Sequence, residues 1–249
     1  MLKKLVKGLI ETMGYEVISK SLTKKSLVEL SPEIVGKLET CMPYTMTSWE
    51  RLQGIAIAVN YINANEIQGD FVECGVWAGG SIGAACLVDE KFGSRDYWLY
   101  DTFEGMTKPA LHDGEIAINE FRRLESDNGY SDWCRVSVKD VKENLSNLGL
   151  SLERAHFIQG DILKTLLDPV NVPKQISLLR LDTDWYESTK IELEILFDLI
   201  TPGGVLIIDD FGYWEGSRKA VEEFFQRRAL KPMIFPIDHD ARMVIKPLA

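Results

Sequence analysis

The 249-residue chain has no surplus of positive charge and no long apolar run. Its 28 lysines and arginines are outnumbered by 38 aspartates and glutamates, which gives a net charge of −10. Nucleic acids and anionic membrane surfaces are bound through basic patches, so neither kind of partner is predicted. No stretch approaches the ~18 apolar residues needed to span a bilayer, so no membrane span is expected.

Closely spaced cysteine pairs are also missing. The four cysteines are scattered through the chain, and no two form a CxxC motif. We expect them to be reduced and structural in a cytoplasmic protein, because disulfides belong mainly to oxidising compartments. Residues 1–10 are basic and apolar like the start of a signal peptide, but Lys7 and Gly8 interrupt the run and no cleavage site follows. A short amphipathic helix is the simpler interpretation, and this helical N-terminus is a candidate surface for a homo-oligomer.

The GxGxxG motif of dinucleotide-binding domains is absent, although a glycine turn stands in the corresponding place. Residues 70–81 read as a buried strand, a turn from Gly75 to Gly80 and the start of a helix. Glu73 comes just before this turn, and a carboxylate there repels a phosphate but accepts hydrogen bonds from an ammonium or a hydroxyl. That favours S-adenosylmethionine, whose amino-acid end is zwitterionic. A tight turn that needs small residues only for packing is the alternative.

From residue 70 onward, predicted strands and helices alternate, which is typical of βαβ units and a parallel sheet. Two short closing strands around a turn at 238–240 indicate an antiparallel hairpin at the edge of the sheet. Upstream, 33–39 and the run after Ser48 have helical features. The predicted strands are 71–74, 97–100, 155–159, 176–181, 205–208, 233–236 and 242–246, and the main helices between them are 81–92, 138–149 and 189–200.

The segment 103–137 breaks this alternation. It is long and polar and contains several glycines, which is typical of a functional lid or an added helical piece. Its His112 could act as a base, and its Tyr130 and Trp133 could stack on a sugar or simply fill space. Better candidates for shaping a substrate pocket are Tyr186, Tyr213 and Trp214.

Aspartates stand where the apolar strands end. In an open parallel sheet, ligands bind outside the carboxyl ends of the strands. Asp182 ends one strand and Asp209-Asp210 end its expected neighbour, and such carboxylates are the hard ligands that Mg²⁺ prefers. The sequence therefore predicts a magnesium site at Asp182, Asp209 and Asp210, with Asp184 as a competing ligand. Solvated strand ends are the alternative.

Two more strand ends carry acids. Asp101 is placed to bond ribose hydroxyls, or else to cap the turn that follows it. Asp161 is placed to accept from an adenine amino group, or else to cap a helix that begins at Ile162. Because NAD-dependent enzymes use an acid in the same way, Asp101 does not separate NAD from S-adenosylmethionine.

Taken together, five segments resemble the macrocin O-methyltransferase family. They are residues 44–46, 73–80, 101–106, 181–189 and 203–210. Members of that family methylate sugar hydroxyls of natural products with S-adenosylmethionine and Mg²⁺. The resemblance implies an α/β, Rossmann-like class I methyltransferase fold, with a mostly parallel seven-stranded sheet, a helical N-terminal extension and a lid insertion at about 103–137. It divides the chain into a helical lead-in and cofactor cover, 1–66, and a methyltransferase domain, 67–249.

By position, the resemblance also implies which residues hold the cofactor. Glu73 and Gly75 would hold its methionine end, and Thr45 and Met46 would close over it. Thr183 and Trp185 depart from the family, whose usual phrase has glycine and leucine there. The predicted cofactor-binding set is Thr45, Met46, Glu73, Gly75, Gly79, Ser81, Asp101, Thr102, Phe103 and Asp161.

The sequence hypothesis is thus a magnesium-dependent O-methyltransferase that uses S-adenosylmethionine on a hydroxyl of a sugar or glycosylated small molecule. Asp182 is the first candidate for accepting the hydroxyl proton, although a metal-bound carboxylate is a weak base. One alternative is an NAD-dependent oxidoreductase or epimerase, against which the missing GxGxxG and the acidic Glu73 count. The other is a non-catalytic cofactor-binding protein, against which the intact acidic trio counts.

Overall fold

The computed structural model describes residues 30–91, 93–127 and 129–248. The chain divides into two compact units, residues 1–32 and 33–249. The predicted N-terminal helix and a capping motif at 26–29 lie outside the described residues. All strands and the candidate site belong to the second unit, together with α4 (Trp49–Ala64). The proposed division of roles at residue 66 stays a prediction.

A seven-stranded sheet confirms the predicted fold class. Its strand order is β3-β2-β1-β4-β5-β7-β6, and the first five strands are parallel, so their carboxyl ends meet along one rim. β7 is antiparallel to both β5 and β6, which confirms the predicted hairpin at the edge. The strands are β1 (Asp70–Cys74), β2 (Tyr97–Asp101), β3 (Ala155–Gln159), β4 (Ile176–Leu181), β5 (Ile200–Ile208), β6 (Ile234–Pro236) and β7 (Arg242–Ile245).

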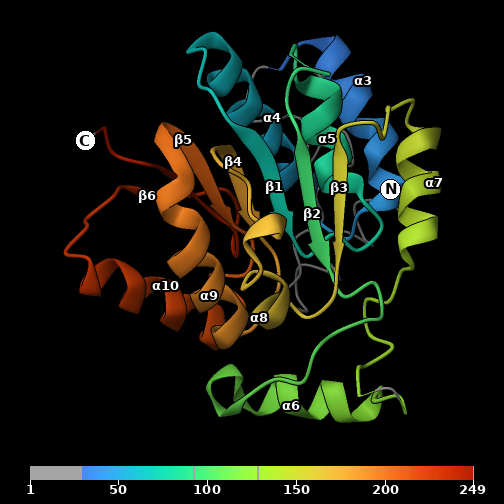
Figure 1. The fold of residues 1–249 in the computed structure, drawn as a ribbon, viewed down its shortest axis with the longest axis vertical. Coiled ribbons are helices and arrows are strands. Elements are labelled where there is room, and N and C mark those ends of the chain that lie inside the picture. Colours follow the sequence, from blue (N-terminus) through green and yellow to red (C-terminus); the bar gives the residue numbers. More distant parts are fainter. Residues whose placement is uncertain (1–29, 92, 128, 249) are drawn as a thin grey trace, which may run out of the picture. The chain divides into compact units, whose positions relative to one another are not determined.

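Helices cover both faces of the sheet (Figure 1). Because both faces are covered, β1, β4 and β5 are buried along most of their length. Alternate side chains, such as Val72 and Leu179, pack with α8, α9 and α10 in one core cluster. The helices are α3 (Pro32–Cys41), α4, α5 (Gly80–Val88) and α7 (Val138–Asn147) on one side, and α8 (Ile162–Thr165), α9 (Tyr186–Leu196) and α10 (Glu215–Arg227) on the other.

Several predicted helix boundaries are wrong. The helix expected over 81–92 is α5 and ends at Val88, and the helix expected to begin at residue 189 is α9 and begins at Tyr186. The helix expected to reach residue 200 ends at Leu196, a short 3-10 turn η4 (Phe197–Leu199) follows, and β5 begins at Ile200 rather than at Val205. Pro202, Gly203 and Gly204 are residue types common in turns, but the strand continues through them. The pairing of β5 with β4 is irregular in this part. Its register shifts between Ile176 and Leu178 of β4, and Gly203 of β5 has a positive φ of 83°.

The insertion 103–137 contains η2 (Leu111–Asp113) and α6 (Gly114–Arg123), and Figure 1 shows α6 beyond the ends of the strands. Asp113 anchors it, because its carboxylate accepts from the backbone N–H of Tyr186 at 2.6 Å. The Trp185 indole N–H donates to the Thr107 carbonyl at 2.9 Å. These two bonds fasten the insertion to the turn after β4, and its role as a lid stays a prediction.

Two expectations from composition concern the whole chain. Among the described residues, no helix is both long enough and apolar enough to cross a membrane. All four cysteines are free, and Cys41, Cys74 and Cys86 are buried.

Candidate active site

A cleft of about 570 Å³ opens at the rim where the parallel strands end. Its lining comes from the strand ends, the segment before α4 and the insertion. Glu73, Gly79, Phe103 and Asp161 do not line it. The predicted residues that do are Thr45, Met46, Gly75, Ser81, Asp101, Thr102, Asp182, Asp209 and Asp210.

The glycine turn at the end of β1 exists because two chain segments meet there with no room between them. Gly75 has a φ of +85°, and a Cβ on it would lie 1.9 Å from the Asp182 carbonyl oxygen. The Asp182 N–H donates to the Cys74 carbonyl at 2.8 Å, which keeps β4's end against the turn. Gly79 then begins α5 with no side-chain cap, and Ser81 lies in the first turn of that helix. The first turn of α5 therefore borders the cleft through Ser81, and the Ile82 N–H of that turn donates to the Glu73 carboxylate.

Asp101 stabilises the glycine turn through backbone hydrogen bonds. Its carboxylate accepts from the N–H groups of Val76 at 2.7 Å, Trp77 at 3.1 Å and Phe103 at 2.7 Å. Burial raises the pKa of Asp101, and these three bonds oppose that rise. The turn-capping alternative is therefore realised, and the predicted ribose contact stays a prediction.

Asp161 is the N-cap residue of α8. Its carboxylate accepts from the Leu163 N–H at 3.0 Å, at the start of α8. Gly160 and Ile162 line the cleft on either side of it. A contact from Asp161 to an adenine amino group stays a prediction.

Glu73 lies beneath the cleft, paired with a buried arginine. Arg180 contacts Glu73 at 2.9 Å, Asp182 at 2.7 Å and Asp209 at 2.7 Å. Burial raises the pKa of Glu73 to about 7, and the charge of Arg180 opposes that rise. A charged residue inside the apolar run 178–181 was a signal for such a buried partner, and the sequence interpretation did not use it.

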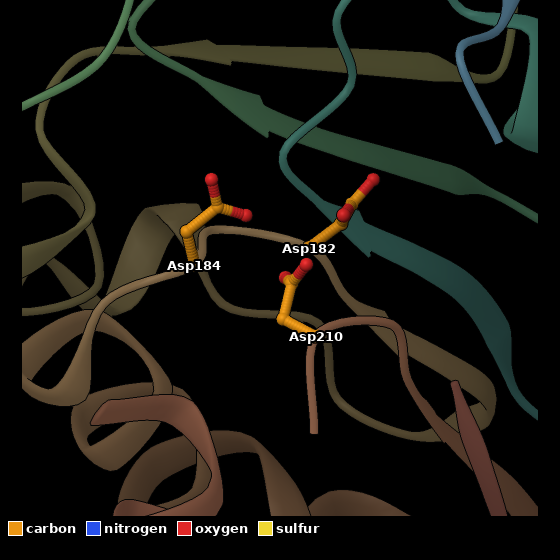
Figure 2. A group of neighbouring side chains, drawn as sticks. All are labelled: Asp182, Asp184 and Asp210. Atoms are coloured by element: carbon orange, nitrogen blue, oxygen red, sulfur yellow. The ribbon is translucent and has the colours of Figure 1, made fainter. Parts of the chain in front are cut away.

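Three carboxylates face a common space at the rim. One oxygen each from Asp182, Asp184 and Asp210 lies within 4.8 Å of the others, and Figure 2 shows the side chains converging from the turn after β4 and the loop after β5. Burial and the neighbouring charges raise the pKa of Asp184 to about 8, and burial raises those of Asp182 and Asp210 well above the ordinary value. We call these three residues the carboxylate cluster. Oxygen-only donors under mutual repulsion fit a hard divalent cation.

Asp209 has a different neighbourhood from the one expected. Its carboxylate is paired with both Arg180 and Arg51 of α4. Arg51 in turn contacts Asp238 at 2.7 Å and Asp240 at 2.8 Å, in the turn between β6 and β7. Asp209 lines the cleft, but in this arrangement Asp184 completes the cluster.

Aromatic side chains form the wall of the cleft beyond the cluster. Trp133, Tyr213 and Trp214 line it, as the sequence interpretation allowed, whereas the Tyr186 hydroxyl donates to Glu223 and does not. His112 lies 3.0 Å from the Lys219 amine, also away from the cleft lining. The histidine therefore gains no support as a base.

Comparison with known proteins gives consistent matches. The family model described as "Macrocin-O-methyltransferase (TylF)" matches residues 10–245. The 8-demethyl-8-(2,3-dimethoxy-alpha-L-rhamnosyl)-tetracenomycin-C 4'-O-methyltransferase of Streptomyces olivaceus is 32% identical over 212 residues, which is 84% of this chain and 78% of that protein. The mycinamicin III 3''-O-methyltransferase of Micromonospora griseorubida is 28% identical, over 87% of this chain and 84% of that protein. Among solved structures, the O-methyltransferase NovP superposes with a TM-score of 0.73 and 27% identity, over 82% of this chain and 83% of that one.

Proposed function

Since the chain belongs to the macrocin O-methyltransferase family, and is therefore an O-methyltransferase, we propose that it transfers the methyl group of S-adenosylmethionine to a hydroxyl of a sugar or a glycosylated small molecule, with Mg²⁺. One observation carries this proposal: the glycine turn and the carboxylate cluster line one and the same cleft. The first suits the amino-acid end of the donor, and the second suits a cation beside an acceptor hydroxyl. Both relatives described above are named for methylation of an oxygen, one of them on a rhamnosyl compound.

The charge of the cleft fits a positively charged donor. Five carboxylates and one guanidinium line the cleft, and an excess of negative charge attracts a sulfonium. Gly75 gives close backbone approach, Ser81 presents the start of α5, and Thr45 lies 3.3 Å from the Ser81 hydroxyl. Bound there, S-adenosylmethionine supplies an electrophilic methyl group. The residues proposed to hold it are those predicted from the sequence: Thr45, Met46, Glu73, Gly75, Gly79, Ser81, Asp101, Thr102, Phe103 and Asp161.

The carboxylate cluster is the proposed metal site. Asp182 and Asp210 belong to it in both the sequence prediction and the structure. Asp209, predicted from the sequence as a ligand, and Asp184, named there as a competing ligand and part of the cluster, are the two candidates for the third position. A magnesium ion there would lower the pKa of a coordinated hydroxyl and fix its position.

The chain's own contribution is alignment and proton transfer. Holding the acceptor oxygen, the methyl carbon and the sulfur in line is worth roughly 7–11 kcal/mol of the barrier. The oxygen–carbon bond forms while the carbon–sulfur bond breaks, and the hydroxyl proton leaves to a base. Asp182 is the proposed base, because its carboxylate lies both in the cleft and in the cluster.

Calorimetry and a methyl-transfer assay test this function. We expect S-adenosylmethionine to bind and NAD not to bind; binding of NAD alone would instead support the oxidoreductase alternative. Transfer should fall in EDTA and return with Mg²⁺. Undiminished transfer in EDTA would remove the metal from the proposal while leaving the methyl transfer intact. The four free cysteines suit a reducing compartment, and we propose the cytoplasm.

A further inference from the structure

Resting on the metal site of the proposed function, we propose that Thr183 and Glu192 are positioning residues that hold the Asp184 carboxylate at the carboxylate cluster before a cation binds. We call Thr183 and Glu192 the positioning pair. Thr183 lines the cleft, whereas Glu192 is fully buried in α9 and does not line it. The pair therefore acts on cation affinity through Asp184 and supplies no carboxylate to the cluster itself.

Asp184 has a strained backbone. Its φ is +68°, in the left-handed region that residues other than glycine rarely adopt. The Trp185 N–H donates to the Thr183 carbonyl at 2.8 Å, so residues 183–185 form a γ-turn of the rare, strained kind, with Asp184 at its centre. Such a conformation persists only where the surrounding structure fixes it, and it is common at functional sites. The residues that fix this turn are therefore candidates for a functional role.

The two residues that flank Asp184 are the two departures from the family phrase. Glycine and leucine, which the family usually has there, carry no polar side-chain atom. In this chain the Thr183 hydroxyl donates to the Glu192 carboxylate at 2.8 Å, and the Trp185 indole N–H donates to the Thr107 carbonyl at 2.9 Å. Each end of the γ-turn is thus fixed by a bond that the family's usual residue could not make.

Glu192 is a costly residue to bury. None of its surface is exposed, and its second carboxylate oxygen has no hydrogen-bond partner among the described residues. Burial raises the pKa of Glu192 well above its ordinary value, and the bond from Thr183 opposes that rise. An apolar side chain of similar size would avoid the cost of burying a carboxyl group. The bond to Thr183, and with it the shape of the γ-turn, is what this residue contributes.

The γ-turn keeps Asp184 beside carboxylates that repel it. One oxygen each from Asp182, Asp184 and Asp210 lies within 4.8 Å of the others (Figure 2). Carboxylates at such distances repel one another and would separate if the backbone were free to move. A cation site whose ligands are already in place binds without the cost of ordering them. The positioning pair therefore raises the affinity of the cluster for a divalent cation.

Mn²⁺ binding, followed by electron paramagnetic resonance, tests the positioning pair. Thr183→Val and Glu192→Met each remove one partner of the bond and nearly keep the size of the side chain. We expect each to raise the Kd for Mn²⁺ by about fivefold to tenfold, and the double variant to show no more than the larger single effect. Thr183→Ser and Glu192→Gln keep the hydroxyl and the acceptor oxygen, so each Kd should stay within about twofold. Glu194→Met is the matched control, because Glu194 lies on the same helix but is exposed and paired with Arg227.

Two further readouts separate positioning from a loss of packing. Asp184→Asn should itself weaken Mn²⁺ binding, and adding Thr183→Val to it should change the Kd no further, because the pair acts through Asp184. Glu192→Met should leave the free energy of unfolding in EDTA undiminished, because it removes a buried carboxyl group. A purely structural role predicts the opposite, a lower free energy of unfolding with an unchanged Kd.

The outcomes distinguish this inference from the proposed function. An unchanged Kd for Mn²⁺ in both Thr183→Val and Glu192→Met overturns the inference and leaves the metal site standing. A further loss of affinity when Thr183→Val is added to Asp184→Asn also overturns it. No Mn²⁺ binding by the unaltered protein instead overturns the metal site of the proposed function, and this inference with it.

Discussion

At the carboxylate cluster, single side chains decide whether a divalent cation binds. Asp182→Asn and Asp210→Asn each remove one of the negative charges that converge there. We expect each change to weaken Mn²⁺ binding, followed by electron paramagnetic resonance, and to lower methyl transfer by about 100-fold or more. Binding of S-adenosylmethionine should persist. Asp198→Asn, at an exposed carboxylate paired with Arg228, is the control.

Asp184 and Asp209 should respond in opposite directions when stability is measured in EDTA. Asp209→Asn removes a carboxylate partner from Arg180 and from Arg51. We expect the free energy of unfolding, measured with urea, to fall by about 3–5 kcal/mol. Asp184→Asn removes one carboxylate from a cluster whose members repel one another. We expect the free energy of unfolding to rise by about 1–2 kcal/mol. A stable Asp209→Asn variant would contradict the ion-pair network. Mn²⁺ binding by the same two variants identifies the third ligand.

These residues also show what a sequence can reveal about a site. Asp182 and Asp210 were predictable because apolar strands end on them and parallel strands share a rim. The partners of Asp209 were not, because Arg51 meets it across 158 positions of the chain. Pattern and spacing carry no information about such distant ion pairs. Asp101 and Asp161 stayed open alternatives for another reason, because a carboxylate at a strand end can cap the following turn or bind a ligand from the same sequence pattern.

At the scale of an element, the glycine turn makes a sharp prediction. Gly75→Ala forces a Cβ to within 1.9 Å of the Asp182 carbonyl oxygen at a φ of +85°, so β1 and the end of β4 must separate. We expect a loss of more than about 3 kcal/mol in urea unfolding and the loss of donor binding. Gly149→Ala is the matched control, because its φ is +80° but nothing lies within 4 Å of the added atom. It should cost only about 1–2 kcal/mol, the strain of the left-handed backbone alone. Equal losses in the two variants would contradict the close approach at Gly75.

The strands were predictable from alternating apolar runs and helices, and their boundaries were less so. β5 was predicted to begin at Val205, and the three residues before it, Pro202, Gly203 and Gly204, are of types common in turns. In the structure, pairing of Ile200 with Ile176 extends the strand by five residues through that sequence. Tertiary pairing overrides local turn preference there. The same cause moves the end of α9 back to Leu196.

At the scale of the whole molecule, a fall in pH should weaken the bonds that Ser48 and Arg51 make to Asp238, which lies in the turn between β6 and β7. Burial opposes ionisation of Asp238, but bonds from Ala241, Ser48 and Arg51 lower its pKa to about 2. The unfolded chain takes up this proton near pH 4 and the folded one only near pH 2, so stability falls as pH decreases through that interval. We expect the loss of unfolding free energy between pH 5 and pH 3 to be smaller in Asp238→Asn than in the unaltered protein. An identical loss in the two would contradict the pairing.

The alternation of strands and helices along the chain predicted a parallel α/β sheet, and the resemblance to the macrocin O-methyltransferase family supplied the seven-stranded class I methyltransferase fold. The strand order β3-β2-β1-β4-β5-β7-β6 was not predicted. The internal arrangement of the insertion could not be predicted in the same way. Its anchors, Asp113 to the Tyr186 N–H and Trp185 to the Thr107 carbonyl, join segments about 75 positions apart by single bonds. Nothing in the local pattern of 103–137 specifies those partners.

The pairing of Arg51 has a consequence for motion. The Arg51 guanidinium of α4 is ion-paired with the loop after β5 and with the turn between β6 and β7. Movement of any one of these three segments away from the others therefore breaks at least one ion pair. Amide protons at 48–52, 209–212 and 238–241 should therefore exchange with deuterium at matched rates, as one cooperative opening unit. Replacing Arg51 with methionine should make that shared opening faster, because only the Ser48–Asp238 and Gly212–Asp240 hydrogen bonds would still join the three segments.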